Sequence, residues 1–82
     1  MKLSIEITMY PLADKYLPII EGFIDHLKKY ENIKLEVFPT STVVMGDFDN
    51  AMEVLASSIK WSVANKDKAV FITKFLPNYE AL

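Results

Sequence analysis

Apolar and polar side chains alternate along the first ten residues of the chain. The apolar set is Leu3, Ile5, Ile7 and Met9, and the set between them is Ser4, Glu6, Thr8 and Tyr10. A period of two is typical of a strand that buries one face. Pro11 ends the pattern, since proline cannot donate to a sheet. We therefore expect a first strand that turns its apolar set to the core and its polar set outward.

Two later segments have the period of a helix. In the first, Asp14 is a candidate cap, Pro18 is tolerable only in the first turn, and Asn32 breaks the pattern. Its apolar stripe is Ile20, Phe23, Ile24 and Leu27, with Tyr30 as a further candidate. In the second, Asn50 and Glu53 have the form of a capping box. Its stripe is Met52, Leu55, Ala56, Ile59 and Val63. Both segments are predicted to be amphipathic helices.

Three further segments are typical of strands. Residues 33–37 alternate, and residues 41–48 and 69–75 are rich in β-branched and aromatic side chains. The register of 41–48 stays open, and so does the outward face of 69–75, where the β-branched pair Val70 and Ile72 indicates burial on both faces. Gly22, inside the first helix, indicates a close approach to the sheet, and Gly46 a bulge or a tight backbone contact.

The element order is therefore β-α-β-β-α-β. Two crossover helices then lie on one face of a four-stranded antiparallel sheet. We predict one ferredoxin-like α+β domain over residues 1–82.

Composition removes several classes of function. The chain has no cysteine, which excludes disulfides and thiolate metal sites, and a formal charge of −2 with scattered lysines. Nucleic-acid binders usually carry a basic patch, so that class ranks low. The start of the chain is not a signal peptide, and no apolar run approaches the ~20 residues of a membrane helix. We expect a cytoplasmic protein with no membrane or nucleic-acid partner.

A ligand is expected on the sheet face without helices or at an oligomer interface. Its candidate contacts are Glu6, Thr8, Tyr10, Phe38, Ser41 and Thr42. Rings and a few placed polar groups suit a flat heteroaromatic ligand, and a mid-strand carboxylate can accept hydrogen bonds from an amino group. The alternatives stay open: Glu6 as a solvated strand residue, and the aromatic and hydroxyl groups as surface or oligomer packing.

Catalytic groups are scarce. His26, the one histidine, stands among charged residues and is expected to be solvated. No cluster has metal-ligand spacing, and no glycine-rich phosphate loop exists. Asp47 and Asp49 are better explained by a helix N-terminus than by acid–base chemistry. Trp61 is expected either at the edge of the core or in a subunit contact. We expect a protein that is not an enzyme and holds no metal or cofactor.

Three segments resemble a known family. Residues 5–12, IEITMYPL, resemble the opening strand of the YKOF-related thiamine/hydroxymethylpyrimidine-binding family. Residues 39–52, PTSTVVMGDFDNAM, resemble its central motif, S-T-x-[IV]-x-G-[DE]-[FY]-[DE]-x-x-M, and residues 68–75 are similar to its last strand. The resemblance covers nearly the whole chain, in the right order and at fitting spacing.

The resemblance implies a ferredoxin-like domain that binds thiamine or its hydroxymethylpyrimidine moiety without chemistry. Ser41 and Thr42 match the motif directly, whereas Glu6, Thr8 and Tyr10 match by their position on the first strand. It also implies paired domains, and therefore a homodimer or homotetramer for a single-domain chain. The alternative is a structural or regulatory homo-oligomer with no small-molecule ligand.

Overall fold

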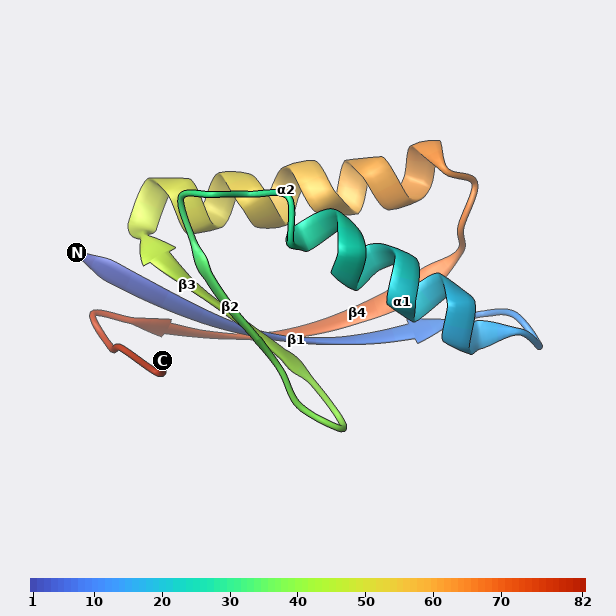
Figure 1. The fold of residues 1–82 in the computed structure, drawn as a ribbon, viewed down its shortest axis with the longest axis horizontal. Helices are drawn as coiled ribbons and strands as arrows, with labels where there is room; N and C mark the ends of the chain where they lie inside the picture. Colours follow the sequence, from blue (N-terminus) through green and yellow to red (C-terminus); the bar gives the residue numbers. More distant parts are fainter.

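The computed structural model describes all residues from 1 to 82. Its elements follow the expected order: β1 (Lys2–Pro11), α1 (Tyr16–Leu27), β2 (Lys34–Val37), β3 (Thr42–Asp47), α2 (Phe48–Ala64) and β4 (Ala69–Pro77). The strands form one antiparallel sheet in the order β2-β3-β1-β4. Both helices lie on the same side of this sheet (Figure 1). The predicted ferredoxin-like α+β fold is confirmed.

β1 supplies the floor of the core, as its alternation predicts. Leu3, Ile5, Ile7 and Met9 are at most 9% exposed and pack with the buried residues of both helices. Burying one side chain of this size contributes about 1.5–3 kcal/mol. That gain explains why this strand, with a neighbour on each side, lies inside the sheet.

Strand pairing settles the open register of β3. Thr42 and Val44 lie opposite Ile7 and Ile5, so they share the face that the helices cover. Val43 and Met45 point to the other face. Gly46 continues the same ladder, so there is no bulge. A Cβ placed there would lie 3.1 Å from Ile33 Cγ2 and 3.2 Å from the Asn32 carbonyl oxygen, which is the tight backbone contact.

The expected helix caps are wrong. α1 begins at Tyr16 after Lys15, and α2 begins at Phe48 after Asp47, both without a side-chain cap hydrogen bond. α2 starts where β3 ends, with no loop in which Asn50 could act as a cap. Gly22 makes no close approach, because a Cβ there would have nothing within 4 Å.

The buried face of α2 also differs from the expected stripe. The buried residues are Ala51, Val54, Leu55, Ser58 and Ser62. Met52 is 38% exposed and Val63 is 66% exposed. Three of these five side chains are small, which permits close packing, so steric fit as well as hydropathy selects this face.

His26 is partly buried rather than fully solvated, and its ring contacts the second helix. Its ring stacks on Trp61 of α2, with centroids 4.4 Å apart and planes inclined by 14°. Its Nε2 lies 3.3 Å from the Tyr30 hydroxyl. Burial, and secondarily the charge of Lys29, lower the pKa of His26. Trp61 packs against the core, which confirms the core-edge alternative.

β4 is an edge strand, and the expectation that it is buried on both faces is wrong. Val70 is 47% exposed and Ile72 54% exposed. The residues after β4 turn back over the open face. There the Ser4 hydroxyl donates to the Tyr79 carbonyl at 2.6 Å and accepts from the Ala81 N–H at 3.0 Å. Ser4 points outward as expected, yet it is fully buried beneath this tail. Neither helix combines the length and apolar character that crossing a membrane requires.

Candidate functional site

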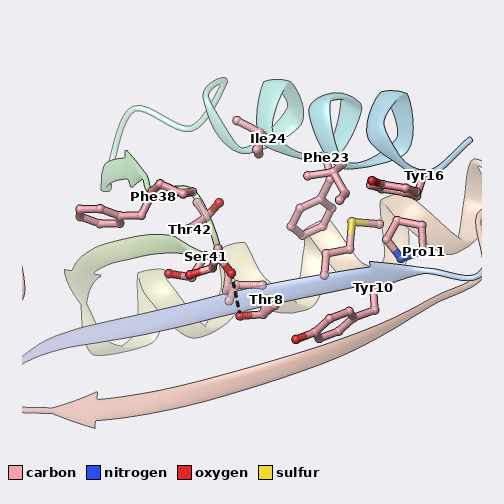
Figure 2. Close-up of a pocket in the computed structure, with 14 residues that line it drawn as sticks. Thr8, Tyr10, Pro11, Tyr16, Phe23, Ile24, Phe38, Ser41 and Thr42 are labelled. Carbon is pink, nitrogen blue, oxygen red and sulfur yellow. Dashed lines mark hydrogen bonds between the residues drawn. The ribbon is translucent and has the colours of Figure 1, made fainter.

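A cavity lies where β1 extends beyond the end of β3. The pairing of these strands ends at Ile7 and Thr42, so residues 8–11 of β1 have no neighbour on that side. The turn between β2 and β3 fills part of the gap, and α1 passes above it (Figure 2). The resulting pocket has a volume of about 480 Å³. It is lined by Ile7, Thr8, Met9, Tyr10, Pro11, Tyr16, Ile20, Phe23, Ile24, Phe38, Pro39, Thr40, Ser41 and Thr42.

Apolar side chains form most of the pocket wall. The Phe23 ring points from α1 toward β1, whereas Tyr10 extends on the side of β1 away from α1 (Figure 2). Phe23 is held by a tilted contact with Phe71 of β4, with ring centroids 5.2 Å apart. Pockets for small organic ligands have volumes of about 300–1,000 Å³ and a mainly apolar lining. Size and wall both fit that class.

The polar groups of the pocket are hydroxyls. Thr8 Oγ1 donates to the Thr40 carbonyl oxygen at 3.3 Å, which ties β1 to the turn (Figure 2). The hydroxyls of Ser41 and Thr42 take part in none of the side-chain hydrogen bonds of the chain. Nor is the Thr42 hydroxyl among the fully sealed polar atoms, although the residue is only 6% exposed. Both hydroxyls are therefore available to a ligand.

The lining contains no acidic or basic side chain of the kind that titrates near neutral pH. It has no carboxylate, amine, imidazole or thiol, and its two tyrosines are the only titratable side chains. No group of three or more potential ligands anywhere in the chain could hold a metal ion. What the arrangement can do is enclose an uncharged molecule between apolar walls and give it hydrogen bonds at one end.

The structure brings together five of the six residues expected at a site. Thr8, Tyr10, Phe38, Ser41 and Thr42 all line the pocket. Glu6 does not: it lies on the open face, where its carboxylate is 3.6 Å from the Lys74 ammonium group. Most of the pocket lies on the helix side of the sheet, not on the bare face where a ligand was expected.

Sequence reasoning missed the contribution of α1. Tyr16, Ile20, Phe23 and Ile24 line the pocket from above. The latter three belong to the predicted apolar stripe and were assigned to the core. Their spacing gives no sign that β3 stops short beneath them. The one available signal was Tyr16, an aromatic residue at the start of the first helix.

Comparisons with known proteins show similarity at the level of fold. Protein SP2199 from Streptococcus pneumoniae superposes with a TM-score of 0.86 at 26% identity, covering 96% of this chain and 89% of that one. A "putative thiamine biosynthesis/salvage protein" from Thermotoga maritima gives 0.81 at 23% identity, covering 99% and 86%. A domain of unknown function, DUF77, from Bacillus cereus gives 0.77 at 14% identity, covering 98% and 77%.

No protein-family model and no curated protein matches the chain. The likeness to these structures extends over nearly the whole chain and most of each neighbour. The neighbours include a protein linked to thiamine and a DUF77 protein, which is consistent with the family that the sequence resembles. What the comparisons establish is that this chain has the fold of these proteins.

Proposed function

We propose that this chain binds a small uncharged heteroaromatic molecule of the hydroxymethylpyrimidine type, without transforming it. The ring would lie in the pocket beneath α1, between Phe23 and the end of β1. The observation that carries the proposal is a cavity of about 480 Å³ whose free polar side chains include the hydroxyls of Ser41 and Thr42. A cytoplasmic location is part of the same proposal.

The neutral lining favours one of the two ligands that the family resemblance implies. Thiamine carries a cationic thiazolium ring, and burying an unpaired charge is strongly unfavourable. The pocket has no carboxylate to pair with that charge, because Glu6 lies outside it and is occupied by Lys74. The pyrimidine moiety has no such cost at neutral pH. We therefore propose that the pyrimidine enters the pocket and that a thiazolium, if present, stays in solvent.

Two further observations support binding rather than catalysis. The only histidine is held between the two helices by Trp61 and Tyr30, away from the pocket lining. A general acid–base mechanism needs a group of suitable pKa within hydrogen-bond reach of the substrate. The Thermotoga maritima neighbour, whose name links it to thiamine biosynthesis or salvage, supports a ligand of this chemistry.

Calorimetric titration with hydroxymethylpyrimidine and with thiamine tests the proposal. We expect saturable heat with hydroxymethylpyrimidine and weaker binding of thiamine. Thr42→Val keeps the shape of the side chain and removes the hydroxyl, so its affinity should fall about tenfold, the value of one hydrogen bond. Thr73→Val makes the same change on β4, away from the pocket, and should leave affinity unaltered. Absence of heat at millimolar ligand would contradict the proposal.

A homo-oligomer, which is the alternative function and is also compatible with a ligand, is favoured by one specific observation: the edge of β4. Natural edge strands are kept short or charged to prevent pairing with other chains. β2, the opposite edge, follows this rule with four residues, two of them charged. β4 has nine residues and a single charge, Lys74. We propose that β4 pairs with β4 of a second copy, as homodimer or as part of a homotetramer.

The outward hydrogen-bonding groups of β4 make this oligomer testable. Lys68 and Asn78 bond to β1, so alternate residues from 68 to 78 face inward and Phe71, Thr73 and Phe75 direct their N–H groups to the free edge. Thr73→Pro removes an outward N–H without breaking the bonds to β1. Light scattering should show the unaltered chain as an oligomer and this variant as a monomer. A monomeric unaltered chain at millimolar concentration would refute the pairing.

A further inference from the structure

The ladder of backbone hydrogen bonds between β1 and β3 ends early. One more hydrogen-bonded pair would be possible before the turn that joins β2 and β3, and it is not formed. Opposite residues of these strands have numbers that sum to 49, from Lys2 and Asp47 to Ile7 and Thr42. The next bonded step would join Met9 to Thr40. That pair is absent from the ladder, and Met9 takes part in none of the backbone hydrogen bonds that join β1 to residues outside the strands.

The direction of the Met9 backbone follows from bonds at both ends of β1. Phe48 N–H donates to the Met1 carbonyl at 2.9 Å, which places the backbone groups of odd-numbered β1 residues on the β3 side. Leu12 N–H donates to the Lys68 carbonyl at 2.8 Å, which places those of even-numbered residues on the β4 side. Antiparallel strands alternate strictly in this way. The N–H and C=O of Met9 therefore both point toward the gap that β3 leaves.

The carbonyl that would complete this step is engaged elsewhere. The Thr40 oxygen accepts the Thr8 hydroxyl at 3.3 Å and takes no bond from Met9. Met9 is only 9% exposed and lines the pocket. Backbone groups at such depth are almost always hydrogen-bonded, to protein, water or a ligand. An unpaired donor and an unpaired acceptor thus lie side by side at a cavity wall.

We propose that the Met9 N–H and C=O form the recognition edge of the pocket, for an uncharged ring that carries an amino group beside a ring nitrogen. The Met9 N–H would donate to the ring nitrogen, and the amino group would donate to the Met9 carbonyl. The ring takes the place of the missing strand residue, which would offer the same acceptor and donor. This inference rests on the proposed function and deepens it, because it names the feature by which the ring is selected.

Backbone recognition adds a selection that the side chains alone do not supply. The hydroxyls of Ser41 and Thr42 can each donate or accept, so they tolerate many ligands. The Met9 pair is fixed in direction by the sheet. A ring without the amino donor leaves the Met9 carbonyl unpaired in a largely apolar cavity, which is the situation in which sites discriminate most strongly.

Amide hydrogen exchange of the unaltered chain, followed by nuclear magnetic resonance, is the first test. Without ligand, the Met9 amide should exchange much faster than the amides of Ile5 and Ile7, its neighbours on the same side of β1. With 4-amino-5-hydroxymethyl-2-methylpyrimidine as probe, its exchange should slow and its resonance should shift. A Met9 amide as protected as that of Ile7 in the free chain would overturn the inference.

A ligand pair and a variant pair complete the test. Replacing the 4-amino group of the probe by methyl removes the donor and should weaken binding about tenfold. Met9→Pro removes the N–H, which is not part of the ladder, whereas Met9→Ala keeps it. The proline variant should therefore bind the probe more weakly than the alanine variant. Binding of the probe with no change at the Met9 amide overturns this inference alone, whereas no binding at all overturns the proposed function with it.

Discussion

Replacing each of the two glycines of the chain by alanine should change the free energy of unfolding in opposite directions. Gly22→Ala places a methyl group where nothing lies within 4 Å, inside α1. Alanine is more favourable than glycine in a helix interior by about 1 kcal/mol. Gly46→Ala places the same group 3.1 Å from Ile33 Cγ2 and 3.2 Å from the Asn32 carbonyl oxygen. Carbon atoms pack best at about 3.5–4.0 Å, so the segment before β2 must move by a few tenths of an ångström.

The expected magnitudes follow from these two environments. Overpacking typically costs about 1–3 kcal/mol, and the lower entropy of alanine in the unfolded chain returns about 0.4–1 kcal/mol. Gly46→Ala should therefore lower the free energy of unfolding by about 1 kcal/mol, and Gly22→Ala should raise it by a similar amount. In a domain of 82 residues, each change corresponds to a shift in Tm of about 4–8 °C.

Urea unfolding, followed by the fluorescence of the single tryptophan, measures both values. The slope of free energy against urea should be the same for the two variants and the unaltered chain, because neither change alters the surface exposed on unfolding. If Gly46→Ala is as stable as the unaltered chain, Asn32 and Ile33 move aside without loss of free energy, and the close contact at Gly46 does not affect stability. If Gly22→Ala is destabilising, the space beside Gly22 is occupied and α1 packs more closely at this position than the structure shows.

Three further predictions concern the tail, the helix pair and the pocket wall. Ser4→Ala removes two hydrogen bonds that hold residues 79–81, so stability should fall by about 1–2 kcal/mol and limited proteolysis should cut the tail faster, whereas Ser57→Ala, inside α2, should leave the proteolysis of the tail unchanged. The lowered pKa of His26 means that the unfolded chain binds more protons, so stability should fall as pH drops below about 6.5, and the urea midpoint of His26→Gln should lose this dependence between pH 6.5 and 5. Phe23→Ala removes a ring that is 2% exposed, so unfolding free energy should fall by about 3–5 kcal/mol, an amount that a midpoint near that of the unaltered chain would contradict.

Much of the fold follows from local patterns in the sequence. The alternation of residues 3–10 places the same four apolar residues in the core as the structure does. The order of elements follows from periods of two and of three to four, because each strand or helix must bury one face of its own. The errors at the caps and in α2 arise because a helix boundary and a buried face depend on neighbours that are distant in sequence. Nothing near Asn50 reveals that β3 passes into α2 without a loop.

The sequence determines which residues are available to the candidate site but not how they are arranged. By itself, the sequence determines the residue types at the site, the hydroxyls of residues 41 and 42 and the strand that ends at Pro11, because these are properties of short segments. Only the tertiary structure decides that β3 stops opposite Ile7 while β1 continues, that α1 closes the gap from above, and that Glu6 is left outside beside Lys74. A cavity forms where neighbouring elements leave space between them unfilled. It therefore depends on the relative lengths and positions of three elements, which no local pattern of side chains encodes.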